Sequence, residues 1–464
     1  MTVCRALFAA GTIALAAGCS MAPSAPPLPG LRAAFVVLGV DGQPIARAIT
    51  ADANCPPIEF DGAGQTMDVR AQPATIPARP RFPGAITKPA AFPVLTCEKT
   101  IPAGTQRASI ANRALPLPKA DPQRILVLGD TGCRLLAVAA GWQACNDPVA
   151  WPFARVAADA AATKPDLVIH VGDYHYREDP CPLGNAGCAG SPWGYGWDVW
   201  DADFFTPGAP LLAAAPWIVI RGNHEACGRA GQGWYRFLDP RPLAPLGTCD
   251  DPANDETADY TASYAVPLGA AGSARDTQFL IFDSSAVGLA ALAPTNQVYT
   301  RYHAQFAQAW DLASRRPNNI FIDHHPILAF ATNPMQPDQP YPGNRALQSV
   351  MQSFYPTVLF PPSVQTVFSG HNHVFEMVSF SSPHPAQFIF GNGGDWLDVP
   401  LKLPLHPGVI PTPGSVIEQI VAHSPFGYVV MDRDGAGWKL LDRDTTGAVT
   451  STCFIKGKRA ECHP

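Results

Sequence analysis

The sequence predicts an α/β fold in which helices cover a layered β-sheet. From residue 119 to the end of the chain, short apolar runs rich in β-branched residues alternate with segments of helical periodicity. Before that point, short apolar runs alternate with Pro and Gly clusters, and helical stretches are few. We therefore expect an α/β sandwich at 119–464, preceded by a small β domain at 31–118.

Composition argues against two broad classes of protein. The formal net charge is −6 and there is no basic run, whereas a nucleic-acid-binding protein needs clustered Lys and Arg to neutralise phosphates. After the N-terminal segment, no run approaches the ~18 apolar residues of a membrane span. We expect neither a nucleic-acid partner nor a mature transmembrane protein.

The N-terminus, residues 1–19, has the pattern of a secretory signal: a charged start, an apolar stretch and a small-residue exit. Its last four residues, Ala16-Ala17-Gly18-Cys19, resemble a bacterial lipobox, which makes Cys19 the lipid-attachment residue. Ala16 stands where Leu is usual, so plain cleavage and release is the alternative. Residues 20–30 are rich in Pro and Ala and are expected to form a tether. The expected location is the periplasm or cell envelope, or outside the cell, with a lipid anchor as the only membrane contact.

Ten of the 12 cysteines remain once Cys4 and Cys19 are set aside. An even number in an exported chain favours disulfides, and the spacing suggests local pairs. A zinc site is the competing interpretation, but the chain has no Cys-x-x-Cys pair. The expected pairs are Cys55–Cys97, Cys133–Cys145, Cys181–Cys188, Cys227–Cys249 and Cys453–Cys462.

Six apolar runs after residue 119 have the length and composition of buried strands. They are Ile125–Leu128, Leu167–Val171, Trp217–Ile220, Phe279–Phe282, Ile320–Ile322 and Val364–Phe368. Segments 151–163 and 296–316 are helix candidates between them. Ligands of such α/β folds bind at the carboxyl ends of the strands, so the residues that follow each strand are the first candidates for a site.

Polar residues of metal-ligand type follow five of these six strands. They are Asp130, Asp173, Asn223 with His224, His324 with His325, and His371 with His373. One such residue is more often a cap or a satisfied core residue, but five at equivalent positions favour a shared site. Carboxylate, amide and imidazole donors suit zinc, manganese and iron. One tetrahedral ion would not use so many donors, whereas two ions about 3.5 to 4 Å apart that share a carboxylate would.

The ordered motifs resemble those of the calcineurin-like metallophosphoesterases over residues 120 to 455. They are Gly129-Asp130-Thr131-Gly132, Gly172-Asp173-Tyr174-His175-Tyr176, Gly222-Asn223-His224-Glu225, His324 two residues before Pro326, and Gly370-His371-Asn372-His373. The resemblance implies a four-layer α/β/β/α metallophosphoesterase sandwich. Most of that superfamily has a His ligand two residues after the first Asp, where this chain has Gly132.

Tyr176, three residues after Asp173, can replace the missing His. This arrangement is similar to the purple acid phosphatases, in which the Tyr is a phenolate ligand to Fe(III), a hard ion that stabilises an anionic oxygen. The resemblance assigns Asp130, Tyr176 and His373 to Fe(III), with Asp173 as the bridge. It assigns Asn223, His324 and His371 to a second ion, a divalent Zn, Mn or Fe. The alternative for Tyr176 is a tyrosine packed under the site whose hydroxyl caps a neighbour.

The resemblance implies a phosphohydrolase acting on small-molecule phosphate esters, which the N-terminal signal predicts to be exported, and a phosphomonoesterase of the purple acid phosphatase type is the leading case. A hydroxide held by the ions is expected to attack phosphorus in line while the ions neutralise the phosphoryl oxygens. His224 matches the family's donor to the leaving oxygen, with Glu225 expected to orient it. The alternatives are a phosphodiesterase or nucleotide hydrolase of the same superfamily, and a non-catalytic surface-binding lipoprotein.

Three further features are open at this stage. His325 and Arg177 lie beside predicted ligands, where structural roles are more common. The aromatic segment 188–205 is either a disulfide-pinned loop packed on the core, which we favour, or a wall of the pocket. The glycines of 390–395 are expected to let the backbone approach the site.

Overall fold

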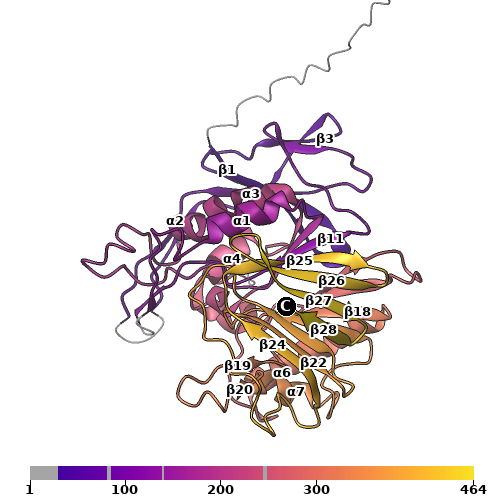
Figure 1. Ribbon diagram of the computed structural model, residues 1–464. Coiled ribbons are helices and arrows are strands. Elements are labelled where there is room, and N and C mark those ends of the chain that lie inside the picture. The colour runs from indigo at the N-terminus through magenta and orange to yellow at the C-terminus, as the bar shows by residue number, and fades with distance from the viewer. Residues whose placement is uncertain (1–29, 81–84, 138–140, 244–247) are drawn as a thin grey trace, which may run out of the picture.

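The computed structural model describes residues 30–80, 85–137, 141–243 and 248–464. Two large β-sheets form the body of the molecule, with helices outside them (Figure 1). The predicted signal peptide and all but the last residue of the predicted tether lie outside the described residues. Within the described ranges, no helix has the length and apolar character needed to cross a membrane.

The first large sheet has eleven strands in the order β28-β27-β26-β25-β11-β14-β15-β1-β2-β8-β5. Strands β11, β14 and β15 run parallel at its centre, and the C-terminal strands β25 to β28 extend it as antiparallel hairpins. In chain order the bounds are β1 Leu31–Leu38, β2 Pro44–Thr50, β5 Asp68–Ala71, β8 Leu95–Thr100, β11 Arg124–Leu128, β14 Leu167–His170, β15 Trp217–Val219, β25 Gly427–Asp434, β26 Gly437–Asp444, β27 Val449–Lys456 and β28 Arg459–His463.

The second large sheet has seven strands in the order β16-β17-β18-β21-β23-β22-β24. Strands β17, β18, β21 and β23 are parallel, and the others pair antiparallel at its edges. The bounds are β16 Tyr264–Leu268, β17 Thr277–Ile281, β18 Asn318–Ile322, β21 Val364–Ser369, β22 Phe375–Phe380, β23 Ala386–Phe390 and β24 Ile417–His423. All six predicted strands are thus confirmed, three in each sheet.

The remaining elements are helices and small sheets. The helices are η1 Val40–Gly42, α1 Phe153–Ala162, α2 Trp197–Trp200, η3 Asp201–Phe205, α3 Thr206–Ala214, η4 Asn223–Glu225, α4 Gly231–Phe237, η6 Pro252–Asn254, α5 Asp255–Ala258, α6 Gln297–Ser314 and α7 Arg345–Met351. The short strands are β3 Pro57–Phe60, β4 Ala63–Thr66, β6 Ala74–Ile76, β7 Ala90–Phe92, β9 Ala108–Ile110, β10 Arg113–Ala114, β12 Leu135–Leu136, β13 Gly141–Trp142, β19 Phe330–Ala331 and β20 Tyr341–Pro342. Helices α1 and α6 confirm both helix predictions.

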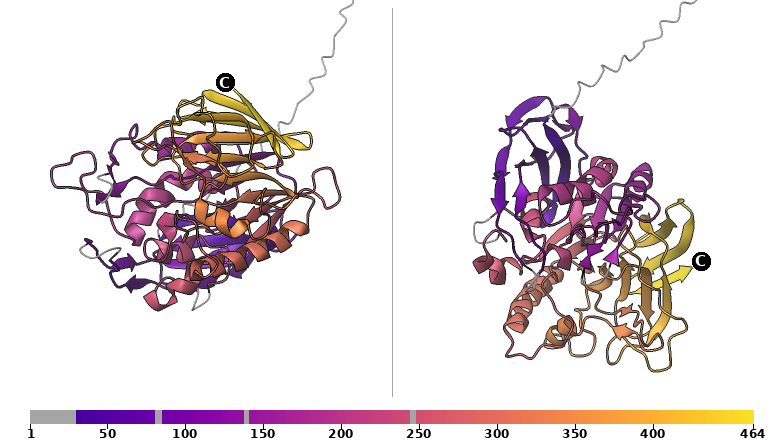
Figure 2. Two further views of the ribbon diagram at one scale, coloured as in Figure 1. Left: turned by 90° about the horizontal axis from the view of Figure 1, so that it is seen from below. Right: turned by 90° about the vertical axis from the view of Figure 1, so that its left-hand side faces the viewer.

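Three apolar cores define the order of the layers. The middle core packs the inner faces of the two sheets together, for example Ile169 of β14 and Phe368 of β21. Because successive strand residues point to opposite faces, Val168 points instead to the core beneath helices α1 and α3. On the far side, Phe306 of α6 and Phe321 of β18 both pack against Phe282 in a third core. The architecture is therefore the four-layer α/β/β/α sandwich that the motifs implied (Figures 1 and 2).

Strands dominate the described part of the N-terminal segment 31–118, where η1 is a single short helical turn, and the segment is continuous with the main body. Strand β1 pairs in parallel with β15 at Val37 and Trp217, and β2, β8 and β5 follow. The eleven-stranded sheet therefore runs across the molecule from the C-terminal hairpins (yellow) to these strands (indigo in Figure 2). One face of β1 and β2 packs beneath the helices, and the other builds a separate core with β3 and β9. Hydrogen bonds and packing thus cross the boundary expected at residue 118.

Two buried arginines join this segment to the main body. Arg47 of β2 is fully buried and donates to the backbone oxygens of Phe237 at 2.9 Å and Asp239 at 2.6 Å. Glu98 of β8 pairs with Arg47 at 3.1 Å and with Arg70 at 2.9 Å. Burial and the neighbouring Arg70 lower the pKa of Arg47 to about 9. Each arginine thus satisfies polar groups that have lost contact with water.

All five predicted disulfides are confirmed. Their sequence separations run from 7 to 42 residues, so each closes a local loop. Such a disulfide content is typical of chains that fold in an oxidising compartment.

We predict that Arg47→Met lowers the free energy of unfolding by about 3 kcal/mol, because it leaves two buried carbonyls unpaired and removes the buried partner of the half-buried Glu98. Chemical denaturation monitored by circular dichroism measures this loss. Arg107→Met is the matched control: Arg107 is exposed in the same segment, and its loss should change the stability by less than about 0.5 kcal/mol. Equal stabilities of the two variants would contradict the prediction.

Candidate metal centre

The predicted ligand residues meet where the carboxyl ends of the two sheets face each other. The turns after β11, β14 and β15 of the first sheet carry Asp130, Asp173 and Asn223. The turns after β18 and β21 of the second sheet carry His324, His371 and His373. Asp130, Asp173 and His371 have φ values of 55°, 57° and 71°. Non-glycine residues adopt this left-handed conformation uncommonly, and residues that do so are enriched at functional sites.

The first cluster of donor atoms surrounds the phenol of Tyr176. Its hydroxyl lies 3.0 Å from Asp130 Oδ1, 2.9 Å from Asp173 Oδ2 and 2.9 Å from His373 Nε2. His373 Nδ1 lies 2.7 Å from the carbonyl oxygen of Trp396, so Nδ1 carries the proton and donates it there. In the neutral ring, Nε2 therefore presents a lone pair to the cluster. Three oxygens and one imidazole nitrogen form a donor set that suits a hard or borderline cation.

The second cluster shares Asp173 with the first. Asn223 Oδ1 lies 3.1 Å from His324 Nε2 and 2.9 Å from His371 Nδ1, and Asp173 Oδ2 lies 3.1 Å from His324 Nε2. His324 Nδ1 faces the carbonyl oxygen of Val171 at 2.9 Å, which again leaves Nε2 as an acceptor in the neutral ring. In that state the lone pair of His324 Nε2 faces the acceptor oxygens Asn223 Oδ1 and Asp173 Oδ2. A cation among these atoms would stabilise the arrangement. Metal-ligating histidines commonly donate their other N–H to a carbonyl in this way.

The electrostatics of the clusters also favour a cation. Burial raises the pKa of Tyr176 well above its usual value, and the Asp130 and Asp173 carboxylates add to the rise. For Asp173, burial alone would raise the pKa, but the His324 and His224 imidazoles and the Arg229 guanidinium together outweigh it and hold the pKa well below the ordinary value. For His324, burial would lower the pKa, but Asp173, Asp130 and the backbone of Val171 together outweigh it and raise the pKa to about 10. In the absence of a cation, a proton on His324 balances Asp173.

His224, the predicted proton donor, lies beside both clusters. Its Nδ1 is 2.7 Å from Glu178 Oε1, and its Nε2 is 4.0 Å from Asp173 Oδ2. Burial, followed by the nearby Arg229 guanidinium, lowers the pKa of His224 to about 4. The carboxylate that holds the ring is therefore Glu178, two residues after Tyr176, and sequence analysis did not identify it.

Glu225 does not orient His224, contrary to our expectation. Its carboxylate accepts hydrogen bonds from the backbone N–H groups of Asp173 at 3.1 Å and Tyr174 at 2.8 Å. It also accepts one from Gly222 at 3.1 Å, because the tight η4 turn directs the side chain back beneath the loop. Glu225 therefore stabilises the backbone that presents Asp173.

Backbone contacts close the remaining side of the centre. Gly393 N donates to the carbonyl oxygen of Gly129 at 3.1 Å, and a Cβ on Gly393 would lie only 2.4 Å from that oxygen. This confirms that the glycines of 390–395 let the backbone approach the site.

Arg177 has a structural contact, since its Nε donates to the buried Asp203 at 2.6 Å. His325 is also buried, with Nδ1 3.1 Å from Ser284 Oγ.

A pocket of about 410 Å³ opens above the two clusters. It is lined by Arg134, Asp173, Tyr176, Asn223, His224, Ala331, Thr332, Pro334, His371, Asn372, His373, Leu397, Asp398 and Val399. Sequence analysis did not identify Arg134, which lies four residues after Asp130.

The aromatic residues of 188–205 are not among the lining residues, and Trp197 and Trp200 pack in the core beneath the helices. This confirms core packing, the interpretation we favoured for that segment.

Comparison with known proteins places this geometry in a family. The family model of calcineurin-like phosphoesterases matches residues 123–375. The structure of purple acid phosphatase PPD1 from yellow lupin (Lupinus luteus) seeds is similar, with a TM-score of 0.52 and 16% identity over 91% of this chain and 74% of that one. The structure of PhoD has a TM-score of 0.52 and 12% identity over 95% of this chain and 94% of that one.

Identities this low show likeness of fold alone, and no curated protein matches the chain. The family model, by contrast, covers more than half of the chain and includes every one of the predicted ligands. The chain therefore belongs to the calcineurin-like phosphoesterase family.

Proposed function

We propose that the protein is an exported phosphomonoesterase of the purple acid phosphatase type, which hydrolyses small-molecule phosphate esters with two bound metal ions. The observation that carries this proposal is the pair of donor clusters that share Asp173 beside one pocket. Membership of the family supports dinuclear metal chemistry. The choice of the purple acid phosphatase type rests on Tyr176, whose hydroxyl lies among the donors of the first cluster.

The donor sets fit the two ions differently. Asp130, Asp173, Tyr176 and His373 would hold Fe(III), and Asp173, Asn223, His324 and His371 would hold a divalent Zn, Mn or Fe. When bound, the ions would lower the pKa of water and neutralise charge on the phosphoryl oxygens. The first set is the richer in oxygen and includes a phenol, which suits the harder and more highly charged ion.

The chain's own residues would act on the leaving group. Glu178 accepts a hydrogen bond from His224 Nδ1, so in the protonated ring Nε2 is the atom that donates a hydrogen bond or proton to the leaving oxygen. Because the pKa of His224 is about 4, we expect this protonated form in acidic solution. The pocket also has apolar lining, which includes Ala331, Pro334, Leu397 and Val399. Such a lining suits an apolar leaving group such as a phenol.

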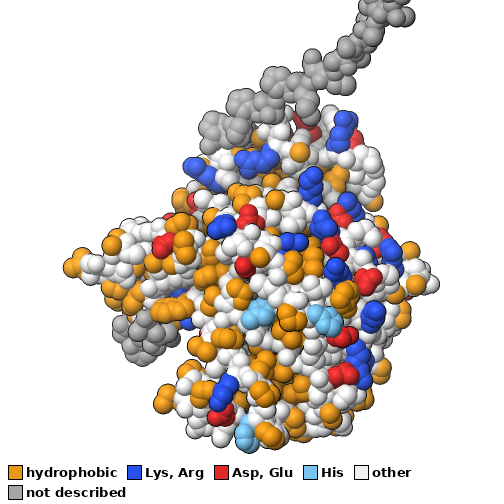
Figure 3. All heavy atoms as spheres, in the orientation of Figure 1, with side chains coloured by type: hydrophobic (Ala, Val, Ile, Leu, Met, Phe, Trp, Pro, Cys, Tyr) orange, Lys and Arg blue, Asp and Glu red, His pale blue; other side chains and the backbone are white. Residues whose placement is uncertain are grey.

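Two observations support the predicted partners and location. On the face shown in Figure 3, Lys and Arg side chains are interspersed with Asp and Glu and form no continuous basic patch. This agrees with a small-molecule substrate rather than a nucleic acid. Five disulfides support export to an oxidising compartment.

The first prediction from this proposal concerns turnover. We expect the metal-loaded protein to hydrolyse 4-nitrophenyl phosphate, a monoester, faster than bis(4-nitrophenyl) phosphate, a diester. His224→Ala should lower kcat for the monoester by about 10²- to 10⁴-fold, the usual contribution of a general acid, while metal content stays nearly unchanged. Kinetics and elemental analysis on the same samples measure both quantities.

His463→Ala is the control, because His463 is an exposed residue of the C-terminal strand β28. Joint loss of metal and activity in His224→Ala would overturn the assignment of His224. If the wild-type protein hydrolyses neither ester, the surface-binding lipoprotein becomes the better explanation.

A second prediction concerns colour. A phenolate on Fe(III) absorbs visible light, so we expect the iron-loaded protein to be purple or pink and Tyr176→Phe to lose the absorption band. Tyr174→Phe is a close control: Tyr174 is also fully buried, two residues away, but its hydroxyl faces backbone groups, the carbonyl oxygen of His170 at 3.4 Å and the backbone of Ile220. Visible spectra and elemental analysis decide the result. A colourless protein with two zinc or manganese ions would keep the phosphoesterase and reject Tyr176 as a ligand.

A third prediction concerns the anchor. We expect the full chain, expressed in a Gram-negative host, to incorporate radiolabelled palmitate and to fractionate with the cell envelope. Cys19→Ser should abolish the label, because the thiol is the attachment point. Cys4→Ser, in the same N-terminal segment, should retain it. Unlabelled protein released in soluble form would instead indicate plain cleavage.

A further inference from the structure

Arg134 is the one Lys or Arg side chain that lines the pocket among the described residues. The proposed function gives it no role, and it belongs to none of the motifs. It lies on the loop that follows Asp130, directly before strand β12. Its side chain is 21% exposed, and its guanidinium carbon lies 5.6 Å from the centre of the Tyr176 ring. A cation beside the donor clusters is placed to meet an anionic substrate.

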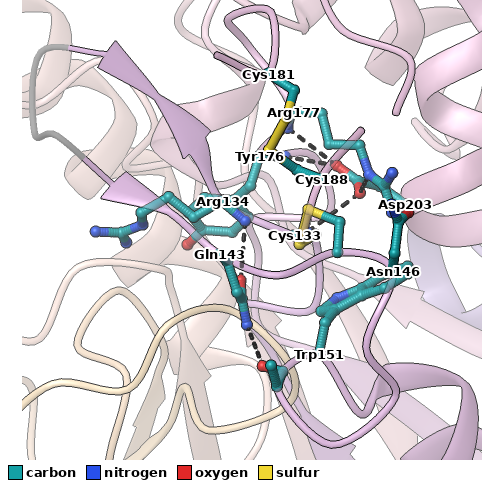
Figure 4. The surroundings of a disulfide bond; sticks show 12 residues. Cys133, Arg134, Gln143, Asn146, Trp151, Tyr176, Arg177, Cys181, Cys188 and Asp203 are labelled. Atoms are coloured by element: carbon teal, nitrogen blue, oxygen red, sulfur yellow. Dashed lines mark hydrogen bonds and ion pairs between the residues drawn. A yellow bond between two sulfur atoms is a disulfide. The ribbon is translucent and has the colours of Figure 1, made fainter. Parts of the chain in front are cut away.

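The backbone of Arg134 is fixed from both sides. The neighbouring Cys133 forms a disulfide with Cys145, which closes the loop that contains the β12–β13 hairpin. Arg134 N donates to Gln143 Oε1 at 2.9 Å, and Gln143 N donates to the Arg134 carbonyl oxygen at 2.9 Å. Gln143 is held in turn by a 2.7 Å hydrogen bond from its Nε2 to the carbonyl oxygen of Ala150. Figure 4 shows the Arg134 side chain extending away from this disulfide and past Tyr176.

The guanidinium is held at one end and open at the other. Its Nε and Nη2 donate to Asp395 Oδ2 at 3.1 Å and 2.6 Å, and Asp395 is fully buried. Nη1 has no hydrogen-bond partner among the described residues, so its two N–H groups are available. The buried Asp395 carboxylate thus fixes the plane of the guanidinium, while the N–H groups of Nη1 can still donate hydrogen bonds.

We propose that Arg134 binds a terminal phosphoryl oxygen of the substrate through Nη1 and thereby makes the site selective for phosphate monoesters over diesters. This inference rests on the proposed function and deepens it. A monoester has three terminal oxygens and a charge near −2, whereas a diester has two terminal oxygens and one charge. A cationic donor in addition to the two donor clusters therefore has an extra oxygen to bind only in the monoester. Charge-assisted hydrogen bonds from arginine are among the stronger polar contacts in proteins.

Arg134→Gln tests this inference, because it removes the charge but keeps a polar side chain. We expect kcat/KM for 4-nitrophenyl phosphate to fall about 10- to 100-fold, the worth of one charged hydrogen bond, while kcat/KM for bis(4-nitrophenyl) phosphate falls less than about threefold. Arg134→Lys should recover part of the monoester activity, because lysine restores the positive charge but not the planar set of guanidinium N–H donors. Arg155→Gln is the charge-matched control, since Arg155 is 57% exposed on helix α1.

A binding measurement provides a second readout that does not depend on turnover. Calorimetric titration of the metal-loaded protein with inorganic phosphate should give a Kd about tenfold higher for Arg134→Gln than for the wild type. Equal losses for both esters, an unchanged phosphate Kd, or loss of bound metal in Arg134→Gln would each overturn the inference. If the wild type hydrolyses neither ester, the proposed function fails, and the phosphate titration alone then decides the role of Arg134.

Discussion

The site depends on the convergence of two buried carboxylates, Asp130 and Asp173, at the ends of adjacent parallel strands. Asp173 Oδ2 contacts the Tyr176 hydroxyl at 2.9 Å and His324 at 3.1 Å, and Oδ1 accepts the backbone N–H of His224 at 2.8 Å. Two anions in an apolar interior are costly unless cations or protons balance them. Much of the surrounding structure can be understood as the means of holding them together.

The two-sheet architecture provides the opposing half of the site. The parallel strands of the first sheet supply the acids and Asn223, and the second sheet supplies the three histidines. Neither sheet has a complete donor set for either ion, so the spacing of the clusters is fixed by the packing of the middle core. Side chains in such a core interdigitate at crystal-like density, which makes the distance between the two sheets reproducible.

Sequence reasoning identified the strands and the ligand candidates because both are local patterns. A buried strand such as Leu167–His170 is an apolar run, and the polar residue after it marks the carboxyl end. The pairing of strands is not local. The six strands divide between two sheets, and β1 joins the central sheet through a single residue pair with β15, Val37 and Trp217. No periodicity within 31–118 indicates that contact.

The direction of the side chains in the turns after the strands was the second feature that the sequence did not predict. Glu225 follows His224 in sequence, but the η4 turn directs its carboxylate beneath Asp173, and Glu178 from a different loop reaches the imidazole. Arg134 belongs to no motif, so only the fold reveals that it lines the pocket. Contacts of this kind depend on the φ and ψ angles of turns, which residue order constrains weakly.

The structure also explains why the residue two positions after Asp130 is glycine. A Cβ on Gly132 would lie 2.9 Å from both the carbonyl oxygen of Tyr174 and the backbone nitrogen of Tyr176, closer than real Cβ atoms approach backbone. Any side chain at 132, and a histidine above all, would push away the loop that carries Tyr176. The tyrosine loop and a histidine at 132 therefore exclude each other sterically. Gly132 is better understood as the condition that lets the Tyr176 phenol reach Asp130 and Asp173 than as a ligand lost from the site.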